Sequence, residues 1–202
     1  MARRRKPVFI NCPFDPGYKP LFDAIVFTVI RCGYHPRCAL EVIDGGQTRI
    51  SKIENLIEDC TLGIHDISRT ELNAHGLPRF NMPLELGLFL GAKRYGEGAQ
   101  KRKRCLVMDT QPYRYQQFMS DIAGQDVEPH NGEVDEVVAK VRAFLNNSKR
   151  GNPLPSWNAI RDSYNAFLVA LPQICLPLGV DPDEFEYQDF TWAAADYVSR
   201  EI

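Results

Sequence analysis

Short apolar runs and longer stretches with helical spacing alternate along most of the chain. The apolar runs, in which we expect strands, are residues 7–11, 34–41, 61–67, 105–109 and 126–128. Apolar residues recur every three or four positions, as on one face of a helix, at 18–32, 48–59, 81–92, 113–122 and 134–145. This repeated alternation predicts a three-layer α/β domain, in which helices cover both faces of a five-stranded parallel sheet.

The pattern changes beyond residue 148, where a run containing Gly and Pro indicates a linker or a tight corner. Two further segments with helical spacing follow it, at 157–176 and 187–198. We therefore predict an α/β domain over residues 1–150 and a helical C-terminal appendage over residues 151–202. The appendage is rich in aromatic residues, which would cover either the sheet domain or a second copy of the chain.

Composition and charge narrow the classes of protein to consider. With 44% apolar residues the chain can bury a substantial core, and its net charge of −2 does not favour a binder of polyanions. The basic segments 2–6 and 101–104 are typical of solvated loops, so we expect nucleic acid binding to be unlikely. Apolar runs are too short for a signal peptide or a membrane span, and we expect a cytoplasmic protein.

The cysteines and histidines do not suggest a metal or a redox centre. The six cysteines include no Cys-x-x-Cys pair and lie mostly in apolar segments, as is typical of reduced core thiols. The four histidines do not have the spacing of metal ligands. We therefore expect no metal and no cofactor other than a nucleotide that serves as substrate.

The segment from Phe80 to Gly91 carries an unusual acidic residue. Asn81 is a suitable N-cap for a helix, and Pro83 is tolerated in the first turn. From Leu84 onward the residues are apolar or small on every side, which predicts a helix that is buried all round. Glu85 is the exception, and a buried carboxylate is costly unless it is paired or used in function.

Two interpretations of Glu85 are open at this point. Burial should raise the pKa of its carboxyl group, whereas the nearby helix N-terminus should lower it. As a structural residue it would form an ion pair with an arginine such as Arg49 or Arg69. As a functional residue it would lie in a site together with other polar groups.

Other polar residues are expected at the same edge of the sheet. Ligands bind open parallel sheets beyond the carboxyl ends of the strands, and the predicted Glu85 helix begins there. The residues that follow the predicted strands or lie in the turns after them are Asn11, Phe14, Asp44, Asp66, Ser68 and Asp109. Asp and Asn are common in turns, so their joint placement around Glu85 carries more weight than any one of them.

The motifs of several enzyme classes are missing from the sequence. No Gly-x-Gly-x-x-Gly follows the first strand, no P-loop lysine motif occurs, and no Gly-x-Ser-x-Gly elbow is present. The remaining candidate is a reaction in which a carboxylate is the catalytic group. When an N-glycosidic bond breaks, the sugar passes through an oxocarbenium-like state that a carboxylate can stabilise or capture, by analogy with glycosidases.

Residues 7–146 resemble two related families. Asn11-Cys12-Pro13-Phe14, Asp66-Ile67-Ser68 and Asn81-Met82-Pro83-Leu84-Glu85-Leu86-Gly87 are similar to nucleoside 2-deoxyribosyltransferases, whose nucleophilic glutamate lies on the helix after the third strand. The same helix resembles that of TIR domains, whose NAD-cleaving members carry a glutamate followed by Leu. The chain departs from the transferases at residues 79–83 and lacks the Trp-Cys element of TIR domains.

The resemblance implies a flavodoxin-like, TIR-like fold and an enzyme that cleaves an N-glycosidic bond in NAD or a related nucleotide or nucleoside. Glu85 and Asp66 would be catalytic, and the residues expected to bind substrate are Asn11, Phe14, Asp44, Ser68 and Asn81. It also implies a homo-oligomer, and for some such proteins a role in anti-phage defence with a partner protein. The alternative is a non-catalytic TIR-like nucleotide sensor or interaction scaffold, in which Glu85 is structural.

Overall fold

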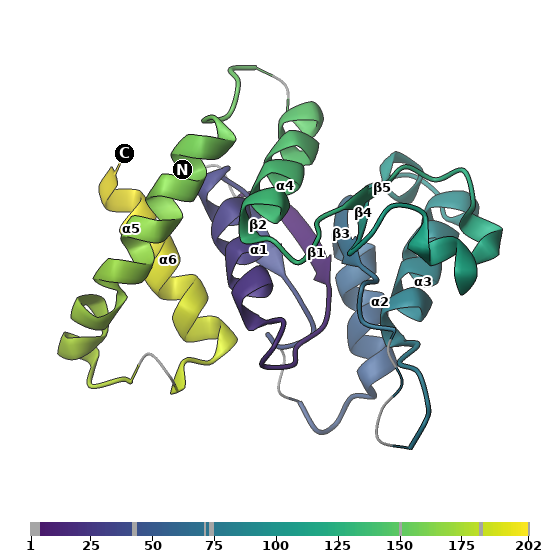
Figure 1. The fold of residues 1–202 in the computed structure, drawn as a ribbon, viewed down its shortest axis with the longest axis horizontal. Helices are drawn as coiled ribbons and strands as arrows, with labels where there is room; N and C mark the ends of the chain where they lie inside the picture. Colours follow the sequence, from purple (N-terminus) through teal and green to yellow (C-terminus); the bar gives the residue numbers. More distant parts are fainter. Residues whose placement is uncertain are drawn as a thin grey trace.

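The fold is α/β, with one sheet of five parallel strands in the order β2-β1-β3-β4-β5 (Figure 1). The computed structural model describes residues 5–41, 44–70, 72, 75–149, 151–181 and 184–201. The strands are β1 (Pro7–Asn11), β2 (His35–Arg37), β3 (Leu62–Asp66), β4 (Arg104–Asp109) and β5 (Val127–Pro129). This order and the helices on both faces confirm the predicted flavodoxin-like, three-layer fold.

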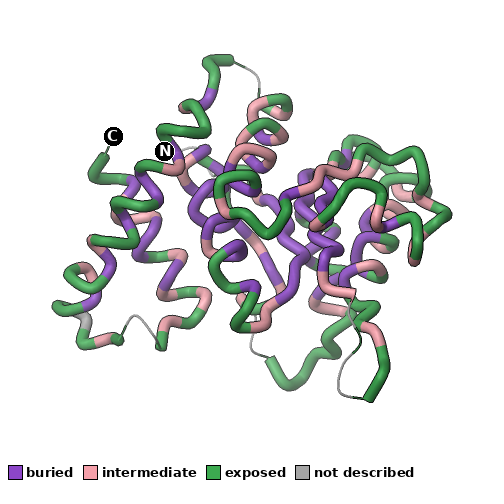
Figure 2. The backbone as a smooth tube through the Cα atoms, in the orientation of Figure 1, coloured by how far each residue is buried: buried purple, intermediate pink, exposed green. Residues whose placement is uncertain are grey.

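Alternate residues of the strands supply the two cores. Val8 and Ile10 of β1 face a large apolar cluster on one side of the sheet, whereas Phe9 between them belongs to a cluster on the other side. Helices α1 (Lys19–Arg31) and α4 (Val134–Ser148) cover the first side, and α2 (Arg49–Asp59) and α3 (Asn81–Tyr95) cover the second. Figure 2 shows the buried backbone concentrated in the central strands and α1.

Two predicted elements are shorter in the structure than the sequence pattern suggested. The strand expected over 34–41 pairs only at His35–Arg37, because the chain then turns away at Cys38–Glu41. The helix expected over 113–122 is instead two 3₁₀ turns, η2 (Arg114–Gln117) and η3 (Ser120–Ile122). Tyr113, before η2, has a left-handed backbone with φ of 59°, which interrupts a regular helix.

The C-terminal segment consists of α5 (Trp157–Cys175) and α6 (Tyr187–Glu201), which lie against the outer side of α1 (Figure 1). Phe167 of α5 stacks on Phe27 of α1 at 5.2 Å between ring centroids, and Phe190 of α6 meets Phe167 edge-on. The buried residues of α5 and α6 belong to the same apolar cluster as the first side of the sheet. Much of the aromatic content of the segment is therefore used within the chain.

This packing also explains the apolar run at residues 24–30, which is buried at every position. It lies in the middle of α1, a helix that packs against the sheet, α4, α5 and α6. A helix enclosed on all sides is apolar all round. Among the described residues, no helix has both the length and the hydropathy needed to cross a membrane.

Candidate active site

Helix α3 holds Glu85 against the sheet, although it differs from the prediction in two ways. Phe80 rather than Asn81 is the N-cap, because its carbonyl already accepts a hydrogen bond from the backbone N–H of Leu84 at 2.9 Å. Asn81 is the exposed first residue of the helix. The helix is also not buried all round, since Leu84 is 55% exposed. One face is buried, formed by Met82, Glu85, Leu86 and Phe89.

Glu85 lies on this buried face and is only 8% exposed. Within the described residues its carboxyl group forms no hydrogen bond and no ion pair. Burial raises the pKa of Glu85 to about 7, and the positive charge of Arg49 acts in the opposite direction. Arg69, the other predicted partner, pairs instead with Asp15 at 3.4 Å. A buried carboxyl group whose charge is not balanced by a close partner is a candidate functional group.

Asn11 fixes the first turn of α3 to the sheet. The strand register places Asn11 beside His65, and its Nδ2 donates to Nδ1 of His65 at 3.1 Å and to the carbonyl of Met82 at 2.9 Å. Burial lowers the pKa of His65 to about 3, so the ring is neutral and its Nδ1 can accept this bond. The amide of Asn11 therefore serves to position the helix that carries Glu85.

A close approach between α3 and β3 depends on Gly63. A Cβ atom at this position would lie 2.9 Å from the ring of Phe89 and 2.7 Å from Nε2 of His65. Any side chain would push α3 away from the sheet, because both contacts are shorter than van der Waals distance. Glycine therefore sets the distance at which Glu85 is held from the strand ends.

Asp66 lies at the end of β3 and is completely buried. Its Oδ2 accepts a hydrogen bond from the hydroxyl group of Tyr18 at 2.5 Å, and its Oδ1 accepts one from the backbone N–H of Ser68 at 2.8 Å. Nε2 of His130 lies 3.0 Å from the same Oδ2, within ion-pair distance but without the direction of a hydrogen bond. Asp66 thus joins the chain segments that follow β1, β3 and β5.

Asp109, at the end of β4, forms a second buried centre. Its Oδ1 accepts hydrogen bonds from the backbone N–H of Thr110 at 2.7 Å and from Nε of Arg114 at 2.8 Å. Arg114 also donates to the carbonyl of Ser68 at 2.7 Å and to the hydroxyl group of Thr70 at 3.0 Å. Arg114 therefore fastens the loop after β3, which leads to α3, to the end of β4.

The other residues predicted to bind substrate lie in different surroundings. Ser68 is buried. Phe14 is half-buried on the α1 side of the sheet and meets Phe22 edge-on at 5.3 Å. Asp44 is exposed, and its Oδ1 accepts from the backbone N–H of Gly46 at 2.8 Å, as in an ordinary turn.

Sequence reasoning missed three side chains that organise this edge, namely Tyr18, Arg114 and His130. Only their positions after predicted strands could have indicated them. Cys12, directly after β1, is buried. Burial raises the pKa of Cys12 well above its ordinary value, and the nearby carboxylates of Asp66 and Glu85 raise it further. This combination makes Cys12 inert and places both carboxylates near one thiol.

Comparison with protein-family models and with curated proteins found no match for this chain. Its function must therefore be argued from the site.

Proposed function

We propose that this protein cleaves an N-glycosidic bond in NAD or a related nucleotide or nucleoside, and that Glu85 acts on the sugar. The observation that carries the proposal is the state of Glu85 itself. Its carboxyl group is buried at the start of α3, has no close partner among the described residues, and has a pKa raised to about 7. A carboxyl group with this pKa is partly ionised at neutral pH, so it can supply the carboxylate that a cationic sugar requires.

The reaction breaks the bond between the anomeric carbon and the base nitrogen, and the electron pair leaves with the base. The sugar then carries positive charge at that carbon, and the carboxylate of Glu85 stabilises this charge or forms an ester with it. Water then adds to the same carbon and loses a proton to solvent; where the ester has formed, its bond to the carbon breaks in this step and the electron pair returns to the carboxylate of Glu85. The nicotinamide ring of NAD is a pyridinium cation while it is attached to ribose, and it would favour the carboxylate form of Glu85, because opposite charges lower a carboxyl pKa.

The neighbouring residues take different parts in this proposal. Asn81 is exposed at the start of α3 and could contact the ribose. Asn11 and Asp66 have their polar atoms engaged within the protein, so we assign them to positioning α3 and the surrounding loops. A direct contact between Asp66 and substrate stays a prediction.

A non-catalytic nucleotide sensor is the alternative. The engagement of Asn11, Asp66 and Asp109 in internal bonds supports it, because it leaves fewer polar groups for substrate at this edge. A sensor would need only a rigid edge and a binding surface. In that case Glu85 would adjust affinity without acting on a bond.

One experiment separates the two functions. The purified protein is incubated with NAD, NADP and a set of nucleosides, and released base is measured by chromatography beside the Glu85→Gln variant. Base release that the variant loses supports the enzyme. Nucleotide binding in calorimetry without base release, from both proteins, supports the sensor. Base release that is the same in both proteins removes Glu85 from the mechanism.

The proposal also includes assembly of several copies in the cytoplasm, with a role in anti-phage defence. Trp157 and Trp192 support assembly, since they remain 37% and 50% exposed, whereas Tyr164, Phe167 and Phe190 of the same two helices are buried. Exposed tryptophans are enriched in protein interfaces. Light scattering over a range of protein concentrations tests this part, and a chain that stays monomeric while releasing base excludes it.

A further inference from the structure

A basic groove lies at the amino edge of the sheet, opposite the edge where Glu85 is found. It has a volume of about 810 Å³. Its positive side chains come from three separate segments: the start of β1, the start of β4 and the end of α4. They are Arg5, Lys6, Arg102, Arg104 and Lys149, and all five are exposed.

The run 101–104 contributes to this groove in a way that the sequence did not reveal. Lys103 is 1% exposed and turns inward, where its ammonium group donates to the carbonyls of Ile57 and Cys60. The exposed residues on either side of it, Arg102 and Arg104, line the groove. The basic run is therefore only partly a solvated loop.

Within the part of the chain that the structure describes, no carboxylate neutralises the charges in the groove. Among the described residues, none of the five cations forms an ion pair, and no Asp or Glu lines the groove. Arg104 donates to the carbonyl of Asn147 at 2.8 Å, and Arg102 to the carbonyl of Gly98 at 3.3 Å. Bonds to neutral carbonyls leave the full positive charge in place.

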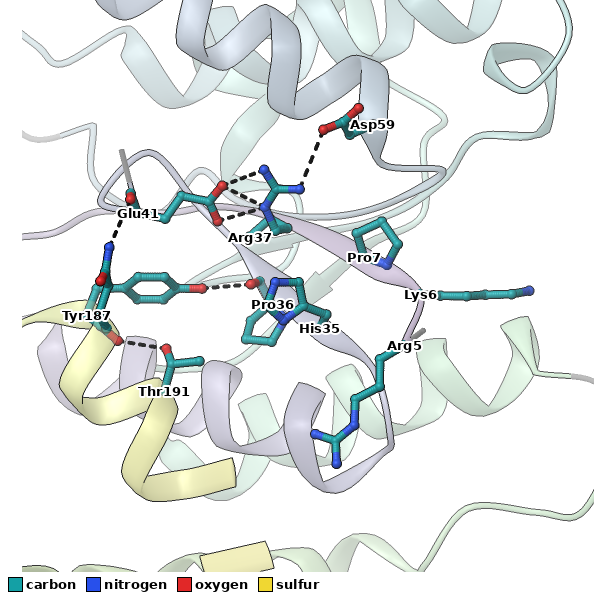
Figure 3. Close-up of a pocket in the computed structure, with 11 residues that line it drawn as sticks. Arg5, Lys6, Pro7, His35, Pro36, Arg37, Glu41, Asp59, Tyr187 and Thr191 are labelled. Carbon is teal, nitrogen blue, oxygen red and sulfur yellow. Dashed lines mark hydrogen bonds and ion pairs between the residues drawn. The ribbon is translucent and has the colours of Figure 1, made fainter. Parts of the chain in front are cut away.

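A neighbouring hollow shows the opposite arrangement (Figure 3). It has a volume of about 970 Å³ along β2 and shares Arg5 and Lys6 with the groove. There the guanidinium group of Arg37 is held by the carboxylates of Glu41 and Asp59. Of the arginine and lysine side chains in this hollow, only Arg37 is compensated, whereas Arg5 and Lys6, which it shares with the groove, form no ion pair among the described residues.

We propose that the groove binds duplex nucleic acid through its phosphate backbone, without regard to base sequence. Five exposed cations around one hollow, none of them ion-paired among the described residues, can contact several phosphates of a nucleic acid backbone. The apolar lining residues, Cys32, Tyr34 and Leu62, are all less than 9% exposed. The groove therefore presents neither the aromatic platform that single strands use nor the apolar anchors that favour a membrane surface.

This inference does not rest on the chemistry proposed for Glu85, because the two sites lie at opposite ends of the strands. A Glu85→Gln protein should bind duplex as tightly as the wild type. Loss of base release with duplex binding retained, or the reverse, would separate the two proposals.

Fluorescence anisotropy with a short labelled DNA duplex of mixed sequence tests the groove. If three to five phosphates are contacted, affinity should fall by about 50- to 500-fold between about 50 and about 200 mM KCl. Arg102→Gln combined with Lys149→Gln should weaken binding by at least about 10-fold and make the salt dependence shallower by about two phosphate contacts.

The matched control is Lys140→Gln combined with Arg200→Gln, which removes the same net charge. Both of these cations are ion-paired, to Glu128 and Asp196 respectively, so binding should stay within about 2-fold of the wild type. If both double variants lose the same affinity for the duplex, net charge alone explains the effect and the proposal is overturned. No binding at low salt would overturn it too, as would tighter binding of a single strand or of phosphatidylserine vesicles.

Discussion

The two edges of the sheet differ in the sign and the burial of their charged side chains. At the carboxyl edge, Asp66 and Asp109 are completely buried, and Asp66 accepts hydrogen bonds at both carboxylate oxygens, whereas among the described residues Asp109 accepts them only at Oδ1. Glu85 is buried without a hydrogen bond or an ion pair to the described residues. At the amino edge, Lys103 is buried with two carbonyl partners, and the other cations are exposed. Paired buried charges hold the fold together. A buried charge without a partner costs stability, and a group of exposed like charges repels itself, so both point to function.

The largest effect should come from Glu85→Gln at the carboxyl edge. Base release should fall at least about 1000-fold, because the neutral amide keeps the shape of the side chain but cannot stabilise a cationic sugar. The control is Glu54→Gln on the exposed side of α2, which should leave the rate unchanged. Wild-type activity of Glu85→Gln would exclude the mechanism proposed here.

The pH dependence of the wild type sharpens this test. Since the reactive form is the carboxylate and burial raises the pKa of Glu85 to about 7, activity should rise as pH increases through about 7. Between pH 6 and pH 8 the expected increase is about 10-fold. A rate that instead falls over this interval would assign Glu85 to proton donation.

Asp66→Asn should have the largest effect on folding. It replaces a buried carboxylate that accepts from Tyr18 and Ser68 and lies beside His130, so at least one donor would lose its acceptor. We expect unfolding free energy to fall by about 3 kcal/mol in urea titration. Base release by the folded fraction should fall less than in Glu85→Gln, because Asp66 acts by positioning.

Asp44→Asn is the matched control, since Asp44 lies in an exposed turn and accepts a single backbone bond. Its stability should change by less than about 0.5 kcal/mol. If the folded Asp66→Asn protein loses as much activity as Glu85→Gln, then Asp66 contacts the substrate after all.

Lys103→Met makes the corresponding change at the amino edge. The methionine fills similar space next to Phe89 but removes the ammonium donor from the carbonyls of Ile57 and Cys60 at the end of α2, and the carbonyl of Ile57 keeps only the backbone N–H of Cys60 at 3.3 Å. We expect a loss of about 2 kcal/mol in urea titration. Lys101→Met, at an exposed neighbour that donates to the carbonyl of Arg94, should cost much less. Equal losses would show that the burial of Lys103 is unimportant.

The comparison of the two edges also shows where sequence reasoning works. Strands β1, β3 and β4 were predicted to within one residue, because strands buried on both faces are apolar runs. The burial of Glu85 followed from one charge within an apolar helix. In contrast, the bond from Tyr18 to Asp66 joins residues 48 positions apart and leaves no local pattern. The basic groove was missed for the same reason, since its cations come from three distant segments.

The smallest expected effect is the contribution of Glu85 to the folding stability of the protein, which can be measured separately from its role in base release. Because burial raises its pKa from 4.5 to about 7, the folded state holds a proton that the unfolded chain has already released over this interval. The contribution of Glu85 to the stability of the wild type therefore falls as pH rises from about 4.5 to about 7. The shift corresponds to at most about 3 kcal/mol, and the residual contact of the carboxyl group with solvent reduces it to about 1–2 kcal/mol.

Glu85→Gln removes this cost, so the variant should be more stable than the wild type by about 1–2 kcal/mol above pH 7 and equally stable below pH 4.5. Urea titrations at several pH values, with Glu54→Gln as the control, measure the difference. A variant that is less stable at every pH would mean that the carboxylate has a stabilising partner, and Glu85 would then be structural. A variant that is more stable but no longer releases base would show that the carboxylate of Glu85 destabilises the fold and is needed for the reaction.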